Sequence, residues 1–385
     1  MTLHELIDNE SERRKRFPVV CDRVYLAHAG VSPLPRAAVV AMQDFLASAS
    51  ADSQDNPHTE PLEREGREVG AALIGCDPDE VALLGPTTLG LNLVALGLPW
   101  QPGDEVVFYA DDYPANVYPW QGLADRGVTL RRLRPDLPGR ITPSLVEAAL
   151  SERTRLVALA SCHFLSGRRI DIDAIGAMLR KRGVLFCVDG IQTVGAFPTS
   201  VANVDFLSAD SHKWMLGPAG AGIFYVRREL HNVLRPALLG SWNVYSPQFV
   251  AQEQVAYYAG ARRYECGMLN LPGIAGMIGA GRMLLALGVD AIADRIRELR
   301  ALLVDLAAER GYELYGGPND DPAAQSGIVT LRQPARDLSV VARRLADAGV
   351  AASLRHNRKG EPLLRFSPHF YNTFSEIEVA ANLLG

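Results

Sequence analysis

A lysine and an aspartate each follow an apolar, β-rich stretch of the chain and could together support amine chemistry. Asp189 ends the run VLFCVD, and Lys213 follows FLSADSH and precedes a bend rich in glycine and proline. Open α/β sheets bind ligands at the carboxyl ends of their strands, so both side chains are expected at one site. An amine that forms a Schiff base and a carboxylate that keeps a pyridine nitrogen protonated suit pyridoxal 5′-phosphate (PLP). The pair predicts PLP as cofactor, with Lys213 also placed to move protons at a substrate Cα.

A threonine pair opens an apolar helix and supplies a candidate phosphate site. In LLGPTTLGLNLVALGL, Thr87 and Thr88 follow a predicted strand, so their hydroxyls and the free N–H groups of the helix can converge on a dianion. Taken alone, the pair is better explained by ordinary helix capping, and the lysine and aspartate motifs reverse that preference in favour of the phosphate site. His212, beside Lys213, fits either a group that orients the site or a packing histidine.

The surrounding elements predict an α/β fold. From about residue 79 to 226, short apolar strands alternate with helices, which is typical of a mainly parallel sheet flanked by helices. After about residue 265, long helices and short strands predict a smaller α+β domain. The expected division is an N-terminal helical segment at 1–20, a large PLP-binding domain at 21–264 and a small C-terminal domain at 265–385. Helices are expected at roughly 2–15 and 36–75.

Composition excludes several classes of function. The net charge is −5 with no clustered basic face, which disfavours nucleic acid as a partner. The five cysteines are widely spaced without a CxxC pair, so neither a disulfide framework nor a metal site is expected. The N-terminus lacks a signal-peptide core, and no apolar run reaches membrane-spanning length. We therefore expect a soluble, cytoplasmic protein without a membrane partner.

Ordered motifs along nearly the whole chain resemble the class V aminotransferases of PLP fold type I. This family includes cysteine desulfurases, selenocysteine lyases and isopenicillin N epimerase-like enzymes. The motifs that carry the resemblance are YLAHAGVSPLP at 25–35, GPTTLGLN at 85–92, DYPANVYPW at 112–120, VDGIQTVG at 188–195, SADSHKW at 208–214, RYECGMLNLPGI at 263–274 and LLRFSPHFYNT at 363–373.

The resemblance implies a role for each matching residue. Lys213 would be the Schiff-base lysine, Asp189 the partner of the pyridinium nitrogen and Gln192 a donor to the phenolic oxygen of the cofactor. Tyr113 would stack on the pyridine ring. Thr88, Thr87 and His212 would bind phosphate, and Arg365 would clamp the substrate α-carboxylate. The weaker candidates are Asn116 and His163 for contacts near the ring and His28 for contact with substrate. The resemblance also implies a homodimer with active sites at its interface.

Two departures from the family pattern bear on the reaction. Desulfurases carry a persulfide-forming cysteine shortly before the substrate arginine, whereas this stretch reads SLRHNRKGEPLLRFS. Met268 stands where many relatives have a threonine that reaches the phosphate in the neighbouring subunit. We therefore expect an enzyme that acts on a small amino acid through a Cα carbanion, and favour a C–S or C–Se β-lyase over an aminotransferase or an epimerase. A non-catalytic PLP-binding protein is the alternative from another class.

Overall fold

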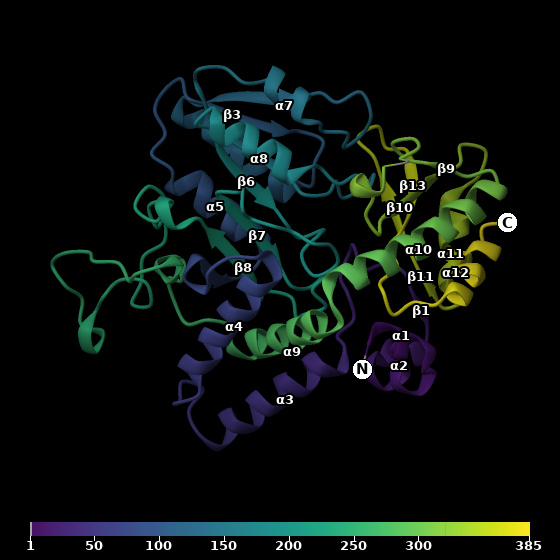
Figure 1. Cartoon of the computed structure of the whole chain (residues 1–385), viewed down its shortest axis with the longest axis horizontal. Helices are drawn as coiled ribbons and strands as arrows, with labels where there is room; N and C mark the ends of the chain where they lie inside the picture. Colours follow the sequence, from purple (N-terminus) through teal and green to yellow (C-terminus); the bar gives the residue numbers. More distant parts are fainter. Residues whose placement is uncertain (1, 320) are drawn as a thin grey trace.

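The computed structural model describes residues 2–319 and 321–385, and a seven-stranded sheet forms its centre (Figure 1). Strand β8 is antiparallel to both of its neighbours, β2 and β7, and the other neighbouring strands are parallel. The mainly parallel sheet predicted from the sequence is confirmed. In spatial order the strands are β2 (Val81–Leu84), β8 (Gly222–Val226), β7 (Phe206–Asp210), β6 (Leu185–Asp189), β5 (Thr154–Ala160), β3 (Glu105–Tyr109) and β4 (Thr129–Leu133).

Helices cover both faces of this sheet, which explains why its central strands are apolar throughout. Along β3, Val106 and Phe108 enter one hydrophobic core, whereas Val107 and Tyr109 enter the other. Successive side chains of a strand point to opposite faces, so a strand covered on both sides has no solvent-facing position. One face packs on α5 (Thr87–Gly97) and α6 (Tyr118–Gln121), and the other on α4 (Thr59–Ile74), α8 (Ile172–Lys181) and α9 (Leu271–Leu287).

The helices expected at roughly 36–75 are present as two helices separated by a short connecting segment. Helix α3 (Arg36–Ala51) ends before α4 begins at Thr59, and both pack against α9. The connecting sequence DSQDNPH is dense in Asp, Asn, Ser and Pro, which favour turns because their side chains hydrogen-bond the local backbone or fix φ. In the segment expected at 2–15, α1 (Leu3–Asp8) and α2 (Glu10–Arg16) meet at Asn9, whose side chain caps α2.

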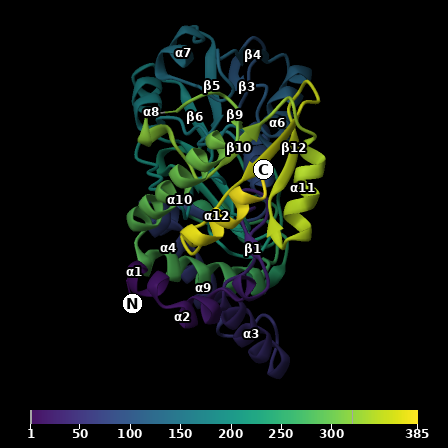
Figure 2. The ribbon, with the colours of Figure 1, turned by 90° about the vertical axis from the view of Figure 1, so that its right-hand side faces the viewer.

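A smaller antiparallel sheet lies beside the large one and faces the viewer in Figure 2. Its strands, in spatial order, are β12 (Ser353–His356), β13 (Pro362–Phe366), β10 (Val329–Arg332) and β9 (Glu313–Leu314). The helices of this region are α10 (Val289–Glu309), α11 (Leu338–Asp347) and α12 (Phe374–Asn382). The remaining helix, α7 (Pro143–Ala148), belongs to the large domain and lies beside α8.

The start of the chain packs on this smaller region. Strand β1 (Val24–Tyr25) pairs in parallel with β11 (Val350–Ala351), and the Phe17 ring stacks on that of Tyr371 with centroids 4.2 Å apart. The domain boundaries expected at residues 20 and 264 stay a prediction. Residues from both ends of the chain nevertheless pack together in the smaller region.

Two findings concern metals and membranes. Among residues 2–319 and 321–385, no group of three or more His, Cys, Asp or Glu side chains is arranged to hold a metal ion. In the same ranges no single helix has the length and apolarity to span a membrane, although α9 and α10 pass that test together as a pair bent by 83°.

Candidate active site

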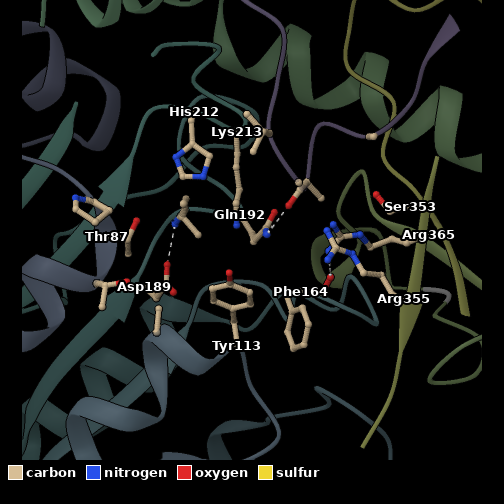
Figure 3. A pocket seen from close by; sticks show the side chains of 18 of the residues that line it. Thr87, Tyr113, Phe164, Asp189, Gln192, His212, Lys213, Ser353, Arg355 and Arg365 are labelled. Atoms are coloured by element: carbon tan, nitrogen blue, oxygen red, sulfur yellow. Dashed lines mark hydrogen bonds between the residues drawn. The ribbon is translucent and has the colours of Figure 1, made fainter. Parts of the chain in front are cut away.

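A cavity of about 450 Å³ lies where the carboxyl ends of β6 and β7 approach the small sheet (Figure 3). The large domain contributes Asp189, Lys213 and Tyr113 to its wall, and Arg365 enters from β13. Pockets for small ligands commonly fall between about 300 and 1,000 Å³. The structure therefore joins residues that lie far apart in the sequence into one site of suitable size.

Lys213 lies in a tight turn that follows β7. The Ser32 hydroxyl donates to the Lys213 carbonyl at 2.6 Å, and the Leu216 N–H donates to the same carbonyl at 3.1 Å. Leu216 has a φ of 57°, a conformation that non-glycine residues adopt only where their surroundings hold them. Burial lowers the pKa of the Lys213 amine to about 8, against the opposing effect of Asp189. With this pKa, roughly a tenth of the amine is neutral at pH 7, and the neutral form is the one that Schiff-base formation requires.

Asp189 is the last residue of β6 and is buried at the wall of the cavity. Its Oδ1 accepts a hydrogen bond from the Ile191 N–H at 3.0 Å, which leaves Oδ2 for another donor. Burial raises the pKa of this carboxyl, while the Ile191 N–H and the Lys213 charge oppose the rise. A buried carboxylate of this kind is stabilised by a protonated ring nitrogen, so Asp189 suits the predicted pyridinium contact.

Tyr113 and Gln192 line the same cavity from two loops. The Lys213 Nζ lies 5.3 Å from the centre of the Tyr113 ring, and this ring packs edge-on against Phe164. The Gln192 Nε2 donates to the Ala29 carbonyl at 3.2 Å, and its Oε1 accepts from the Trp214 indole at 2.8 Å. Gln192 is thus held firmly and keeps one N–H for a ligand, while Tyr113 offers an aromatic face beside the amine.

The amino end of α5 opens onto the cavity through Thr87 and Thr88. Pro86 precedes the helix and no side chain caps its first turn, so N–H groups there remain for an anion. The Thr87 Oγ1 accepts from the Asp210 N–H at 2.9 Å and keeps its own hydrogen to donate.

The carboxylate of Asp210 contacts neighbouring protein groups. Its Oδ2 lies 3.0 Å from the His212 Nδ1 and accepts from the Gly220 N–H at 3.1 Å, and it does not line the cavity. The contact between Asp210 and His212 lacks the geometry of a hydrogen bond. His212 itself lines the cavity, so one imidazole can face a phosphate while its other edge faces a carboxylate.

Arg365 offers an anion-binding guanidinium at the opposite end of the cavity. Its side chain is buried, its Nη1 donates to the Phe164 carbonyl at 2.7 Å, and its Nε has no hydrogen-bond partner among the described residues. Burial, together with the charge of Arg355, lowers the pKa of Arg365 to about 9. A buried cation with an unused N–H is costly unless an anion completes it, so the geometry suits a carboxylate ligand.

Three predicted residues lie outside the cavity. His28 is fully buried, and its ring nitrogens contact the Ser367 carbonyl at 2.8 Å and the Tyr371 hydroxyl at 2.6 Å. His163 contacts the Asp111 carbonyl and the Ser166 hydroxyl. Asn116 bonds the side chains of Asp112 and Trp120. Neighbouring protein groups contact the polar atoms of His28, His163 and Asn116, and their predicted ligand contacts stay predictions.

The sequence reasoning assigned no role to several residues that line the cavity, among them Phe164, Ser353 and Arg355. The alternation in SLRHN, opposite LLRFS, was an available signal. If the two stretches pair as a hairpin, Ser353 and Arg355 share a face with Arg365. The structure has this pairing, with Ser353 opposite Arg365.

The cavity as a whole fits PLP. An amine, a buried carboxylate, an aromatic face and an uncapped helix end line one cavity. In the same order, these groups suit the carbonyl, the ring nitrogen, the ring face and the phosphate of PLP. The roles assigned to the individual residues stay predictions.

Comparisons with known proteins agree with this assignment. The family model "Aminotransferase class-V" matches residues 24–379. The chain is 28% identical to a probable cysteine desulfurase of Methanothermobacter thermautotrophicus, over 96% of each chain, and 30% identical to the isopenicillin N epimerase of Streptomyces clavuligerus, over 91% of this chain and 92% of that protein. The solved apo structure of a cysteine desulfurase from Thermococcus onnurineus superposes with a TM-score of 0.90 at 25% identity, over 97% of each chain.

The family match covers most of the chain, and its fold and cavity chemistry agree. The chain therefore belongs to the class V aminotransferase family and is a PLP-dependent enzyme of fold type I.

Proposed function

We propose that this enzyme is a β-lyase that cleaves the C–S or C–Se bond of a small amino acid. The observation that carries the proposal is a cavity that combines the Lys213 amine with the Arg365 guanidinium, while none of its described lining residues is a cysteine. An amine beside a bound α-carboxylate can take the Cα proton. With no thiol in the wall to accept sulfur, the sulfur is expected to leave with the second product.

The residues would share the work as follows. Arg365 binds the α-carboxylate and so orients the Cα–H bond toward the Lys213 Nζ. PLP, when bound, supplies the electron sink for the Cα carbanion. Lys213 accepts the Cα proton, the electron pair moves into a Cα=Cβ bond, and the Cβ–S bond breaks with its electrons on sulfur. The protonated amine can then return a proton to the departing thiolate. The released enamine hydrolyses to pyruvate and ammonia.

Three of the five cysteines are poorly suited to carry an enzyme persulfide, which supports release of sulfur with the second product. Burial raises the pKa of Cys162 and of Cys76 to about 12, which keeps these thiols protonated and poorly nucleophilic. Cys187 is buried within β6, and burial raises its pKa as well. The turn between β12 and β13, residues 357–361, contains no cysteine.

The test is to incubate the PLP-loaded enzyme with cystine and a panel of S-alkyl cysteines. The expected result is stoichiometric pyruvate, ammonia and free thiol or persulfide. Formation of the aminated cofactor together with a 2-oxo acid, without pyruvate, would identify an aminotransferase. Inversion at Cα without loss of sulfur would identify an epimerase. No spectral change with any amino acid would favour a non-catalytic PLP-binding protein.

We further propose that the enzyme is a homodimer. The segment between β8 and α9 projects from the body of the molecule, on the left of Figure 1, and exposes several large apolar side chains. They include Tyr245, Phe249, Val250, Val255 and Met268. Contiguous exposed apolar groups of this kind commonly mark an interface. Light scattering coupled to size-exclusion chromatography should give twice the mass of the 41.8 kDa chain, and a monomer would contradict the proposal.

A cytoplasmic location remains part of the proposal. All five cysteines are free, which suits a compartment that keeps thiols reduced. Fractionation of the source cells with an antibody against the protein should recover it in the cytoplasmic fraction, and recovery elsewhere would contradict this.

A further inference from the structure

A second guanidinium lies beside Arg365 in the cavity. Arg355 stands on β12 and Arg365 on β13, and both line the cavity wall, where Figure 3 shows the two guanidinium groups close together. In the register of these strands Ser353 is opposite Arg365, so Arg355, two residues further along, projects from the same face. A methyl group built on Gly30 would lie 3.7 Å from the Arg355 Nη2 and 3.8 Å from the Arg365 Nη2. The guanidinium groups of Arg355 and Arg365 therefore both lie close to Gly30.

This pair of cations has no counter-charge in the described part of the protein. Neither arginine has a carboxylate within ion-pair distance in residues 2–319 and 321–385, and within these ranges Arg355 makes no hydrogen bond. Arg358, in the turn of the same hairpin, does have a counter-charge, because its Nε lies 2.8 Å from the Asp111 Oδ1. Two like charges held together without a partner repel, and the charge of Arg355 contributes to the lowered pKa of Arg365. A ligand with two negative groups would relieve both effects.

The two arginines differ in depth, which assigns them different parts of a ligand. Arg365 is buried and affects the Lys213 amine more strongly than Arg355 does, so it is the one placed for a carboxylate on the reacting carbon. Arg355 is exposed and reaches the same cavity from nearer its mouth. A group bound there would belong to the substrate side chain.

We propose that Arg355 binds a second carboxylate, so that the substrate is an amino acid with an acidic side chain. The inference rests on the proposed function in taking the α-carboxylate to Arg365 and the Cα proton to Lys213. It adds the substrate class, a dicarboxylic amino acid whose distal carboxylate lies beyond the bond that breaks. A guanidinium suits this role because its planar N–H fork matches a carboxylate.

The test uses two probes of nearly equal size and shape that differ in one charge. S-carboxymethyl-L-cysteine carries a distal carboxylate, and S-carbamoylmethyl-L-cysteine carries the neutral amide in its place. Each is titrated into the PLP-loaded enzyme, and the dissociation constant is read from the change in cofactor absorbance. The wild type should bind the carboxylate about tenfold or more tightly than the amide, as expected for a charge-assisted contact.

Variants then separate Arg355 from the general charge of the hairpin. In Arg355→Gln the ratio of the two dissociation constants should fall to about one, because the remaining amide no longer favours the anion. Arg358→Gln removes a neighbouring positive charge that does not line the cavity, and should keep the wild-type ratio. Circular dichroism confirms that each variant is folded.

The outcomes distinguish this inference from the proposed lyase reaction. Equal binding of both probes by the wild type, or an unchanged ratio in Arg355→Gln, would overturn the second-carboxylate site even if pyruvate forms. If neither probe yields pyruvate but the wild type prefers the carboxylate and Arg355→Gln does not, the site stands and the lyase reaction fails. The pair L-glutamate and L-glutamine repeats the binding test with ligands that have no C–S bond.

Discussion

Replacing Arg365 by lysine tests the carboxylate site without removing its positive charge. In the structure the Nη1 of Arg365 donates to the Phe164 carbonyl, and its Nη2 makes no hydrogen bond to the described residues, so the Nη2 edge remains for a ligand carboxylate. Arginine can make two parallel hydrogen bonds from that edge, whereas a lysine ammonium behaves as a point charge. Losing one charge-assisted hydrogen bond costs about 1.5–3 kcal/mol, which corresponds to a roughly 10- to 150-fold weaker dissociation constant.

The assay is a titration of the PLP-loaded protein with L-cysteine and with L-alanine, which share the α-carboxylate and differ in the side chain. Both dissociation constants should weaken by the same factor in Arg365→Lys, because the lost contact is common to the two ligands. Arg358→Lys is the matched control, since that arginine lies in the same hairpin and pairs with Asp111. A folded, cofactor-loaded Arg365→Lys enzyme that binds both ligands within a factor of two of the wild type would refute the assignment.

Further predictions concern the other charged groups. Lys213→Ala should lose the visible band of covalently held cofactor while the circular dichroism spectrum stays the same, and retention of the band would remove Lys213 from this role. Asp189→Asn should keep the band but lower kcat by roughly 100- to 1,000-fold, since a preorganised charge is lost, and unchanged turnover would contradict this. For the PLP-free protein, Lys213→Met should raise the stability toward urea below pH 8 by on the order of 3 kcal/mol. The pKa of the Lys213 amine is about 8 in the folded protein against 10.5 in the unfolded chain, so the gain in stability should fade as the pH rises from 8 to 10.5. A gain independent of pH would contradict this prediction. Arg67→Met should destabilise the fold by about 3–5 kcal/mol because it leaves the buried Glu265 without its ion-pair partner, and a loss below 1 kcal/mol in the same urea assay would argue against that pair.

The central sheet and the cofactor side of the cavity were predictable because local sequence reports them. Strands such as β6 are apolar on both faces, and the change from an apolar run to Asp189 marks the carboxyl end of a strand. The turn that carries Lys213 is likewise signalled by its glycines and proline. The strand ends and the lysine turn can be predicted because each depends only on a short stretch of chain.

The remaining site residues depend on contacts between distant segments. His28 was expected at the substrate, yet the Tyr371 hydroxyl and the Ser367 carbonyl, both more than 300 residues away, occupy its nitrogens. Arg355 was overlooked because one exposed arginine in a hairpin is ordinary. Its significance arises only when the pairing of β12 with β13 sets it beside Arg365.

The pairing of β1 with β11 has a consequence for the order in which the enzyme is made. Every predicted cofactor ligand, from Thr87 to Lys213, precedes Arg365 and strand β11 in the chain and is therefore synthesised before them. The segment that contains β1 is synthesised more than 300 residues before β11, the strand with which it pairs. That segment must therefore remain without its partner strand until β11 has been made. A nascent chain can therefore assemble its predicted cofactor pocket before Arg365, the predicted carboxylate-binding residue, has been made. Cofactor loading can then precede the ability to bind substrate.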